Sequence, residues 1–195
     1  MAENALNQLR YLVIGGSAGS LEVILDLVTH LPALPHAVVI LVVHRKKDND
    51  SILVDLLSYR TKLPVREVED KETISPDTIY LAPPDYHLLI ERADLFSLDI
   101  SEKVHFSRPS IDVTFESVAE AFGDRVIGIL LSGANADGAV GMAKIRKAGG
   151  YTIVQDPATA DVGYMPQQAL DLTPVDSILP AAEIPGLLEK LLRIQ

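Results

Sequence analysis

The sequence of 195 residues contains no cysteine. This absence excludes a disulfide framework, a thiolate metal site and a cysteine nucleophile, and it fits a reducing compartment, so we expect the cytoplasm. Long apolar runs are also absent, since no stretch approaches the roughly 20 residues of a membrane span. The segment from Met1 to Arg10 lacks the apolar core of a signal peptide. We therefore expect a soluble protein without membrane insertion.

Positive charge is scarce as well. The chain has 17 basic and 27 acidic residues and a formal net charge of -10. A protein that binds a phosphate backbone needs a basic face, so we expect no nucleic acid as a partner. An acidic substrate would need a local basic patch to offset the overall field. The length and the 48% hydrophobic content suit one compact domain, and no repeat or linker divides the chain.

Short apolar segments alternate with helical patterns along the chain. We expect strands at residues 11–14, 37–43, 65–68, 78–82, 125–131 and 151–154. We expect helices at residues 21–28, 52–57, 111–122, 139–148, 165–170 and 184–192. Two further segments, 87–90 and 95–99, are predicted to form an antiparallel hairpin added to the main sheet. The predicted fold class is α/β, with a doubly wound, mostly parallel sheet, helices on both faces and a small antiparallel hairpin.

Three loops that follow buried strands carry residues suited to chemistry, at positions 16–20, 44–50 and 132–138. In doubly wound sheets, ligands bind outside the carboxyl ends of the strands. The first loop places Ser17 among small residues, between a strand and a helix, where backbone N–H groups and the helix dipole favour an oxyanion. A phosphate cradle or a simple tight turn is the alternative, although the loop matches neither a dinucleotide fingerprint nor a P-loop.

A serine hydroxyl needs a base within hydrogen-bond reach, and His44 ends the next long buried strand. A basic anion-binding loop, His44 to Lys47, is the alternative role for this segment. Asp137 follows another buried strand and is the candidate for the carboxylate that orients the imidazole. On its own, an aspartate at this place is more often a helix N-cap, so the hypothesis depends on serine, histidine and aspartate all lying at strand exits.

The residues also resemble a known family. The matching motifs are IGGSAG (14–19), VVH (42–44), YLAP (80–83), RPSID (108–112) and LSGANADGA (131–139). In order and spacing they are similar to the catalytic domain of chemotaxis protein-glutamate methylesterases, the CheB type. The resemblance runs from about Tyr11 to Leu192, and it implies one catalytic domain over residues 1–195 without the receiver domain of longer relatives.

The resemblance implies hydrolysis of glutamate γ-methyl esters on chemoreceptor helices with release of methanol, and some members also deamidate glutamine. The family's serine, histidine and aspartate fall on Ser17, His44 and Asp137. Its oxyanion donor falls on the backbone N–H of Ala134, with that of Ala18 beside the nucleophile. No metal or organic cofactor is implied.

Several consequences concern partners and alternatives. The basic residues Arg45, Lys46, Lys47 and Arg108 are candidate contacts for an acidic receptor helix, and control is expected from a separate signalling regulator or from the supply of substrate. Two other classes of function stay open, a catalytically idle binding or scaffold module and a phosphate or nucleotide binder. Labelling of Ser17 by a fluorophosphonate distinguishes them, because only a nucleophile reacts.

Overall fold

A computed structural model describes residues 9–45, 50–92 and 94–193. Its main sheet is parallel throughout, in the strand order β3-β4-β2-β1-β7-β8-β9. The strands are β1 (Arg10–Gly16), β2 (Ala37–Val43), β3 (Val65–Glu67), β4 (Ile79–Leu81), β7 (Val126–Leu130), β8 (Tyr151–Gln155) and β9 (Ser177–Leu179). The helices are α2 (Leu21–His30), α3 (Asp50–Arg60), α4 (Ile111–Phe122), α5 (Ala139–Lys147), α6 (Tyr164–Leu172) and α7 (Ile184–Arg193). The predicted α/β class and its doubly wound sheet are confirmed.

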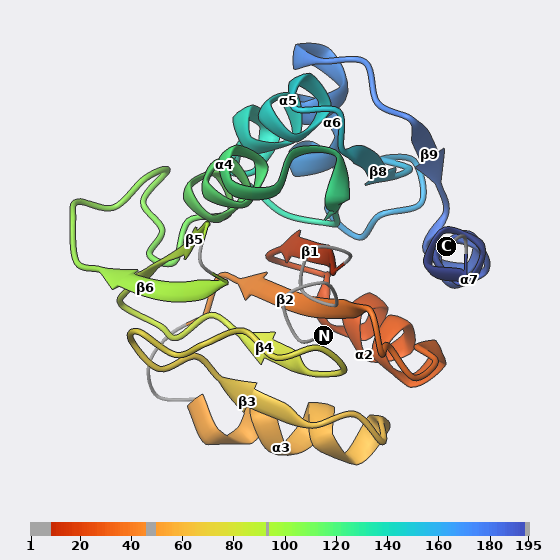
Figure 1. Ribbon diagram of the computed structural model, residues 1–195. Coiled ribbons are helices and arrows are strands. Elements are labelled where there is room, and N and C mark those ends of the chain that lie inside the picture. Colours follow the sequence, from red (N-terminus) through yellow and green to blue (C-terminus); the bar gives the residue numbers. More distant parts are fainter. Residues whose placement is uncertain (1–8, 46–49, 93, 194–195) are drawn as a thin grey trace.

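The sheet separates two apolar cores, because alternate residues of each strand point to opposite faces. On β2, Val38, Ile40 and Val42 enter the core shared with α4, α5 and α6. Val39, Leu41 and Val43 enter the other core, with α2, α3 and α7. All seven residues of β2 are buried, as the uniformly apolar segment predicts. Figure 1 shows the resulting layers, with α4, α5 and α6 on one side of the sheet and the other helices on the opposite side.

The hairpin forms at the predicted residues, but it is not part of the main sheet. The strands β5 (His87–Glu91) and β6 (Leu95–Asp99) make a separate antiparallel sheet, so its predicted addition to the main sheet is wrong. The reason lies in α4, whose side chains satisfy the backbone of β5. The hydroxyl of Thr114 donates to the carbonyl of Leu88, and the N–H of Ile90 donates to the hydroxyl of Ser117.

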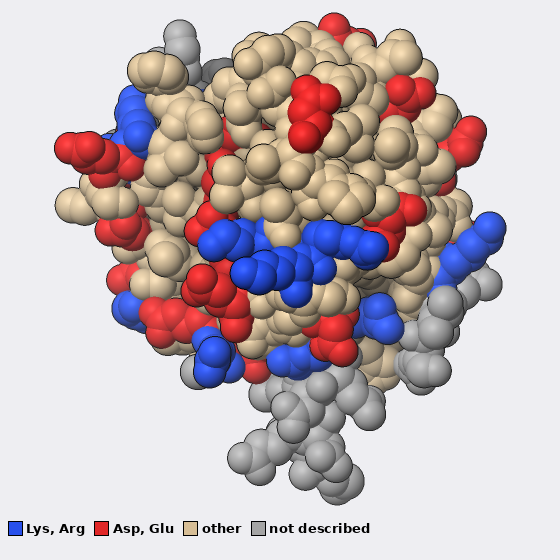
Figure 2. All heavy atoms as spheres, turned by 90° about the horizontal axis from the view of Figure 1, so that it is seen from above, with Lys and Arg blue, Asp and Glu red and all other residues tan. Residues whose placement is uncertain are grey.

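Charge is unevenly spread over the surface. Figure 2 looks onto the molecule from above, where one group of Lys and Arg side chains lies among scattered acidic ones. Within the described ranges, no helix is both long and apolar enough to cross a membrane.

Candidate active site

Ser17 and His44 leave neighbouring strands at the same edge of the sheet. Gly16 of β1 pairs with Val43 of β2 in parallel register, and the N–H of His44 donates to the carbonyl of Gly16 over 3.3 Å. The residues that follow these partners therefore begin side by side, as the strand-exit argument predicts. Ser17 is half-buried and opens the turn that leads into α2.

The loop after β7 is tied to the Ser17 turn by two hydrogen bonds. The N–H of Ser17 donates to the carbonyl of Ser132 over 2.9 Å, and the buried hydroxyl of Ser132 donates to the carbonyl of Ala18 over 2.7 Å. Gly19 lies in the same turn with a φ of +77°, and a Cβ there would come within 2.5 Å of the Cβ of Asp161. The turn thus needs a glycine, and it packs against the segment that follows β8.

His44 and Asp137 form a close pair. The Nε2 atom of His44 lies 2.7 Å from Oδ2 of Asp137, and the Asp137 side chain is fully buried, with 0% exposure. The pairing joins residues 93 positions apart in the sequence. A carboxylate on one ring nitrogen fixes the ring's orientation and favours the tautomer that carries its proton on Nε2.

The carboxylate of Asp137 also lies at the amino end of α4. It accepts hydrogen bonds from the hydroxyl of Ser110 (2.8 Å) and from the N–H groups of Ile111 (2.7 Å) and Asp112 (2.9 Å). The N-cap of its own following helix, α5, is Gly138. The capping role considered from the sequence therefore falls on a different helix, and the same carboxylate contacts His44.

The two buried carboxyl groups at this helix end differ in proton affinity. Burial alone would raise the pKa of Asp137, but hydrogen bonds from His44, the N–H groups of Asp112 and Ile111 and the Ser110 hydroxyl hold that pKa below its usual value. Burial, together with the nearby charge of Asp137, raises the pKa of Asp112 to about 6. Asp137 is therefore ionised at neutral pH and suited to stabilise a charged imidazole.

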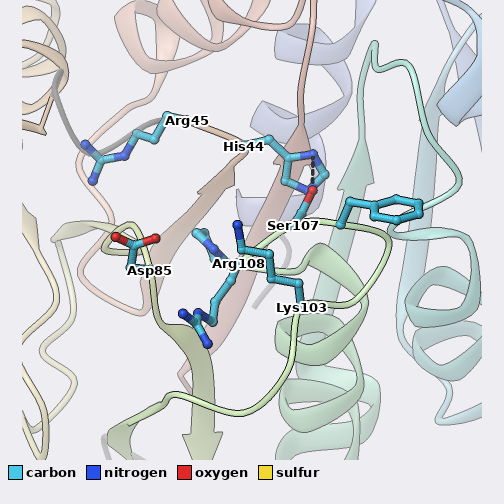
Figure 3. A pocket seen from close by; sticks show the side chains of 8 residues that line it. His44, Arg45, Asp85, Lys103, Ser107 and Arg108 are labelled. Atoms are coloured by element: carbon cyan, nitrogen blue, oxygen red, sulfur yellow. Dashed lines mark hydrogen bonds between the residues drawn. The ribbon is translucent and has the colours of Figure 1, made fainter.

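The second ring nitrogen of His44 faces a residue that the sequence argument did not select. Nδ1 lies 3.3 Å from the hydroxyl oxygen of Ser107, as Figure 3 shows. In the described part of the chain, the hydroxyl of Ser17 makes no hydrogen bond to His44. A catalytic serine often turns to its base only when substrate is bound, so the triad of Ser17, His44 and Asp137 stays a prediction.

A hollow of about 510 Å³ opens beside His44. It is lined by His44, Arg45, Asp85, Lys103, Phe106, Ser107, Arg108 and Pro109. These side chains come from three segments, namely the one after β2, the one between β4 and β5 that carries Asp85, and the one before α4 (Figure 3). Phe106, one of the residues that line this hollow, is 97% exposed.

Arg45 and Arg108, the predicted substrate contacts, line the hollow and are also bonded to other residues of the protein. Arg45 pairs with Glu67, and Nη1 of Arg108 donates to the carbonyls of Ile100 and Ser101 over 2.8 and 2.7 Å. These bonds hold both guanidinium groups in place. Lys46 and Lys47 lie outside the described residues.

The predicted oxyanion donors lie at the exposed edge of the site. Ala18 and Ala134 are exposed, and within the described ranges neither backbone N–H donates a hydrogen bond to the protein. Both N–H groups are therefore available to a substrate oxygen. No group of three or more His, Asp or Glu side chains that could hold a metal ion occurs in the part of the chain that the structure describes.

Several contributors were missed by reasoning from the sequence. Ser107 precedes the RPSID motif and Ser110 lies within it, but nothing in their spacing shows that one faces His44 and the other Asp137. Nε2 of His105 lies 3.4 Å from Oδ2 of Asp112, a contact that the sequence does not indicate either. These contacts depend on how α4 docks against the sheet, which local sequence patterns do not encode.

Comparisons with known proteins identify the family and the fold. The family model described as CheB methylesterase matches residues 12–188. The fold is similar to the crystal structure of the Thermotoga maritima CheB methylesterase catalytic domain, with a TM-score of 0.88 and 31% identity, covering 94% of this chain and 98% of that one.

Curated relatives give the same family. A Leptospira interrogans protein is 41% identical over 180 residues, covering 92% of this chain and 93% of that protein, and its name offers protein-glutamate methylesterase/protein-glutamine glutaminase as a provisional assignment. A Symbiobacterium thermophilum protein named protein-glutamate methylesterase/protein-glutamine glutaminase is 35% identical over 175 residues, which span 90% of this chain and 48% of that longer protein. With its match over nearly the whole sequence, this chain belongs to the CheB methylesterase family.

Proposed function

We propose that this protein hydrolyses the γ-methyl esters of glutamate side chains on chemoreceptor helices and releases methanol. In this proposal, Ser17 is the nucleophile, His44 the general base and Asp137 the carboxylate that orients it. The observation that carries the proposal is the 2.7 Å contact between His44 and the fully buried Asp137, beside the turn of Ser17. Membership of the CheB methylesterase family supports the same chemistry.

The geometry assigns a role to each ring nitrogen of His44. Because Nε2 is bound to Asp137, Nδ1 is the nitrogen that takes the proton of Ser17. The serine oxygen then attacks the ester carbonyl, and the N–H groups of Ala18 and Ala134 stabilise the oxyanion. His44 returns the proton to the departing methanol. Water then hydrolyses the acyl-enzyme by the same proton transfers in reverse order and restores Ser17.

Deamidation of glutamine follows the same route. The attack of Ser17 on a side-chain amide gives the same acyl-enzyme, with ammonia as the leaving group instead of methanol. The double names of the relatives support this second activity.

The proposed partner is a methylated receptor helix, bound along the hollow beside His44. Arg45, Lys103 and Arg108 give this hollow a basic character that suits an acidic helix, although the protein as a whole is acidic. We propose that residues 1–195 act as one catalytic unit in the cytoplasm, because a chain without cysteine suits a reducing compartment.

The test is methanol release from a methylated receptor fragment, measured for the wild type and for Ser17→Ala and His44→Ala. Each variant should lose on the order of 10⁴ or more in kcat, and the double variant should be hardly worse, because the residues act as one unit. Ser58→Ala, an exposed serine on α3, is the matched control and should keep full activity.

Fluorophosphonate labelling separates the alternatives. Labelling at Ser17 that is lost in His44→Ala supports the proposal. A protein that binds the receptor fragment but neither labels nor releases methanol is an idle binding module, and this result would overturn the proposal.

A further inference from the structure

Both ring nitrogens of His44 have partners in the resting site. Nε2 is bound to Asp137 at 2.7 Å, while Nδ1 lies 3.3 Å from the hydroxyl of Ser107. Figure 3 shows Ser107 directed at the imidazole from the segment before α4. The proton of the reaction therefore arrives at a nitrogen that already has a hydroxyl beside it.

The hydroxyl of Ser107 has a second acceptor, because its oxygen also lies 3.4 Å from the carbonyl oxygen of His105. It has one hydrogen and so donates to one acceptor at a time. Towards neutral His44, it donates to the lone pair of Nδ1. Towards protonated His44, its oxygen accepts from Nδ1–H, and its own hydrogen turns to the His105 carbonyl. Because Nδ1 has one lone pair, the Ser107 hydrogen leaves it when Ser17 donates there, and the Ser107 oxygen then accepts from the new Nδ1–H of the charged ring.

The backbone holds Ser107 in this place. Val104 and Ser107 exchange two backbone hydrogen bonds, of 3.2 and 2.8 Å, across a tight turn. The two central residues, His105 and Phe106, have φ values of 48° and 62°, as a type I′ turn requires. These residues lack the glycine that such turns prefer, so the conformation is kept by outside contacts.

Two of those contacts come from the site itself. The side-chain amide of Asn135 donates to the His105 carbonyl over 3.2 Å, and the His105 ring pairs with Asp112 over 3.4 Å. Asn135 belongs to the loop of Asp137, and Asp112 lies in the first turn of α4. The elements that fix Asp137 on one side of the imidazole thus also fix Ser107 on the other.

Resting on the proposed function, we propose that Ser107 is a positioning residue that aims His44 and stabilises its protonated ring while Ser17 is deprotonated. The family's serine falls on Ser17, so Ser107 is assigned the positioning role and not that of the nucleophile. A bond to a charged ring is about twice as strong as one to a neutral ring, so loss of the hydroxyl harms the protonated state more.

The test uses Ser107→Ala, with Ser107→Thr to restore the hydroxyl and Ser101→Ala as a control in the same segment. For Ser107→Ala, we expect the titration midpoint of His44, followed by NMR, to fall by about half a pH unit, and kcat for methanol release to fall about three- to tenfold with little change in KM. Ser107→Thr should recover most of both effects, and Ser101→Ala should show neither.

The other titratable and charged groups near the ring are not substituted in any of these variants. They are Asp137 on Nε2, Arg45, Asp85, Lys103 and Arg108 around the hollow, and His105 and Asp112 behind the turn. A midpoint in Ser107→Ala that is unchanged or higher would overturn the proposal.

The site of labelling provides the second arm. Fluorophosphonate on Ser107 rather than Ser17 in the wild type would make Ser107 the nucleophile and overturn its positioning role. The NMR titration needs no turnover, so it tests Ser107 even where methanol release fails. Failure of the proposed function would instead show as absent methanol release together with a lowered His44 midpoint in Ser107→Ala.

Discussion

The carboxylate of Asp137 bonds both to the imidazole of His44 and to the amino end of α4, and different substitutions remove these two sets of contacts. Its buried carboxylate accepts three hydrogen bonds from Ser110, Ile111 and Asp112 in addition to the contact with His44. Asp137→Ala removes the acceptor and leaves these donors buried. Loss of one partner from a buried, hydrogen-bonded charge pair typically costs about 3 to 5 kcal/mol. We therefore expect Asp137→Ala to lower the free energy of unfolding by about that amount.

His44→Ala provides the contrast. It removes one of the four donors but leaves the carboxylate with its three partners at the end of α4. We expect it to abolish activity while lowering the free energy of unfolding by only about 1 kcal/mol, the typical net value of one hydrogen bond. Asp137→Asn should lie between the two in stability. Its amide has one acceptor oxygen where the carboxylate has two, so it cannot serve both the His44–Ile111 pair and the Ser110–Asp112 pair of donors. It is also neutral and cannot stabilise a charged imidazole, so activity should still be lost.

Urea denaturation at pH 7 with a parallel activity assay measures both effects. The pKa of Asp137 is lowered by folding, so its stabilisation is present above its unfolded value near 4 and is lost as the pH falls further. The gap between the wild type and Asp137→Ala should therefore narrow in acid. An Asp137→Ala variant as stable as His44→Ala at pH 7 would refute this reasoning.

Two further predictions concern the surroundings of the site. Folding raises the pKa of Asp112 to about 6, so the wild type loses stability as the pH rises from about 4 through 6. Asp112→Asn cannot ionise and lacks this loss. Its free energy of unfolding, relative to that of the wild type, should therefore rise by up to about 3 kcal/mol across this pH range. Thermal denaturation between pH 4 and 8 measures this, and a difference independent of pH would contradict it. Phe106→Ala removes an exposed ring at the hollow, so we expect KM for the receptor fragment to rise about tenfold with kcat and stability nearly unchanged, and an unchanged KM would count against a role in docking.

The fold could be predicted because its signals are local. β2 is apolar at every position, and the 3.6-residue pattern of α4 identifies the helix at its observed bounds, residues 111–122. β9 was missed because a strand of three residues at the edge of the sheet leaves too short a pattern. The hairpin was misplaced because its location depends on hydrogen bonds with α4, not on its own residues.

The candidate site could be predicted in part for a similar reason. Strand order and direction bring Ser17 and His44 to one edge of the sheet, and these follow from the alternation of strands and helices. The position of Ser107 depends on the type I′ turn and on its ties to Asn135 and Asp112. Such contacts between distant segments have no signature in a single sequence.

The bonds between Asp137 and α4 have a consequence for how the protein acquires activity. Residues 110 to 137 form a compact section of the chain, in which the acid finds its donors 25 to 27 positions away. Ser17 and His44 come from the opposite end of the polypeptide and meet this section only when β7 pairs with β1. Neither portion alone holds all three residues of the proposed triad. Esterase activity should therefore appear only when both parts of the chain have folded together, and partly folded chains should be inactive.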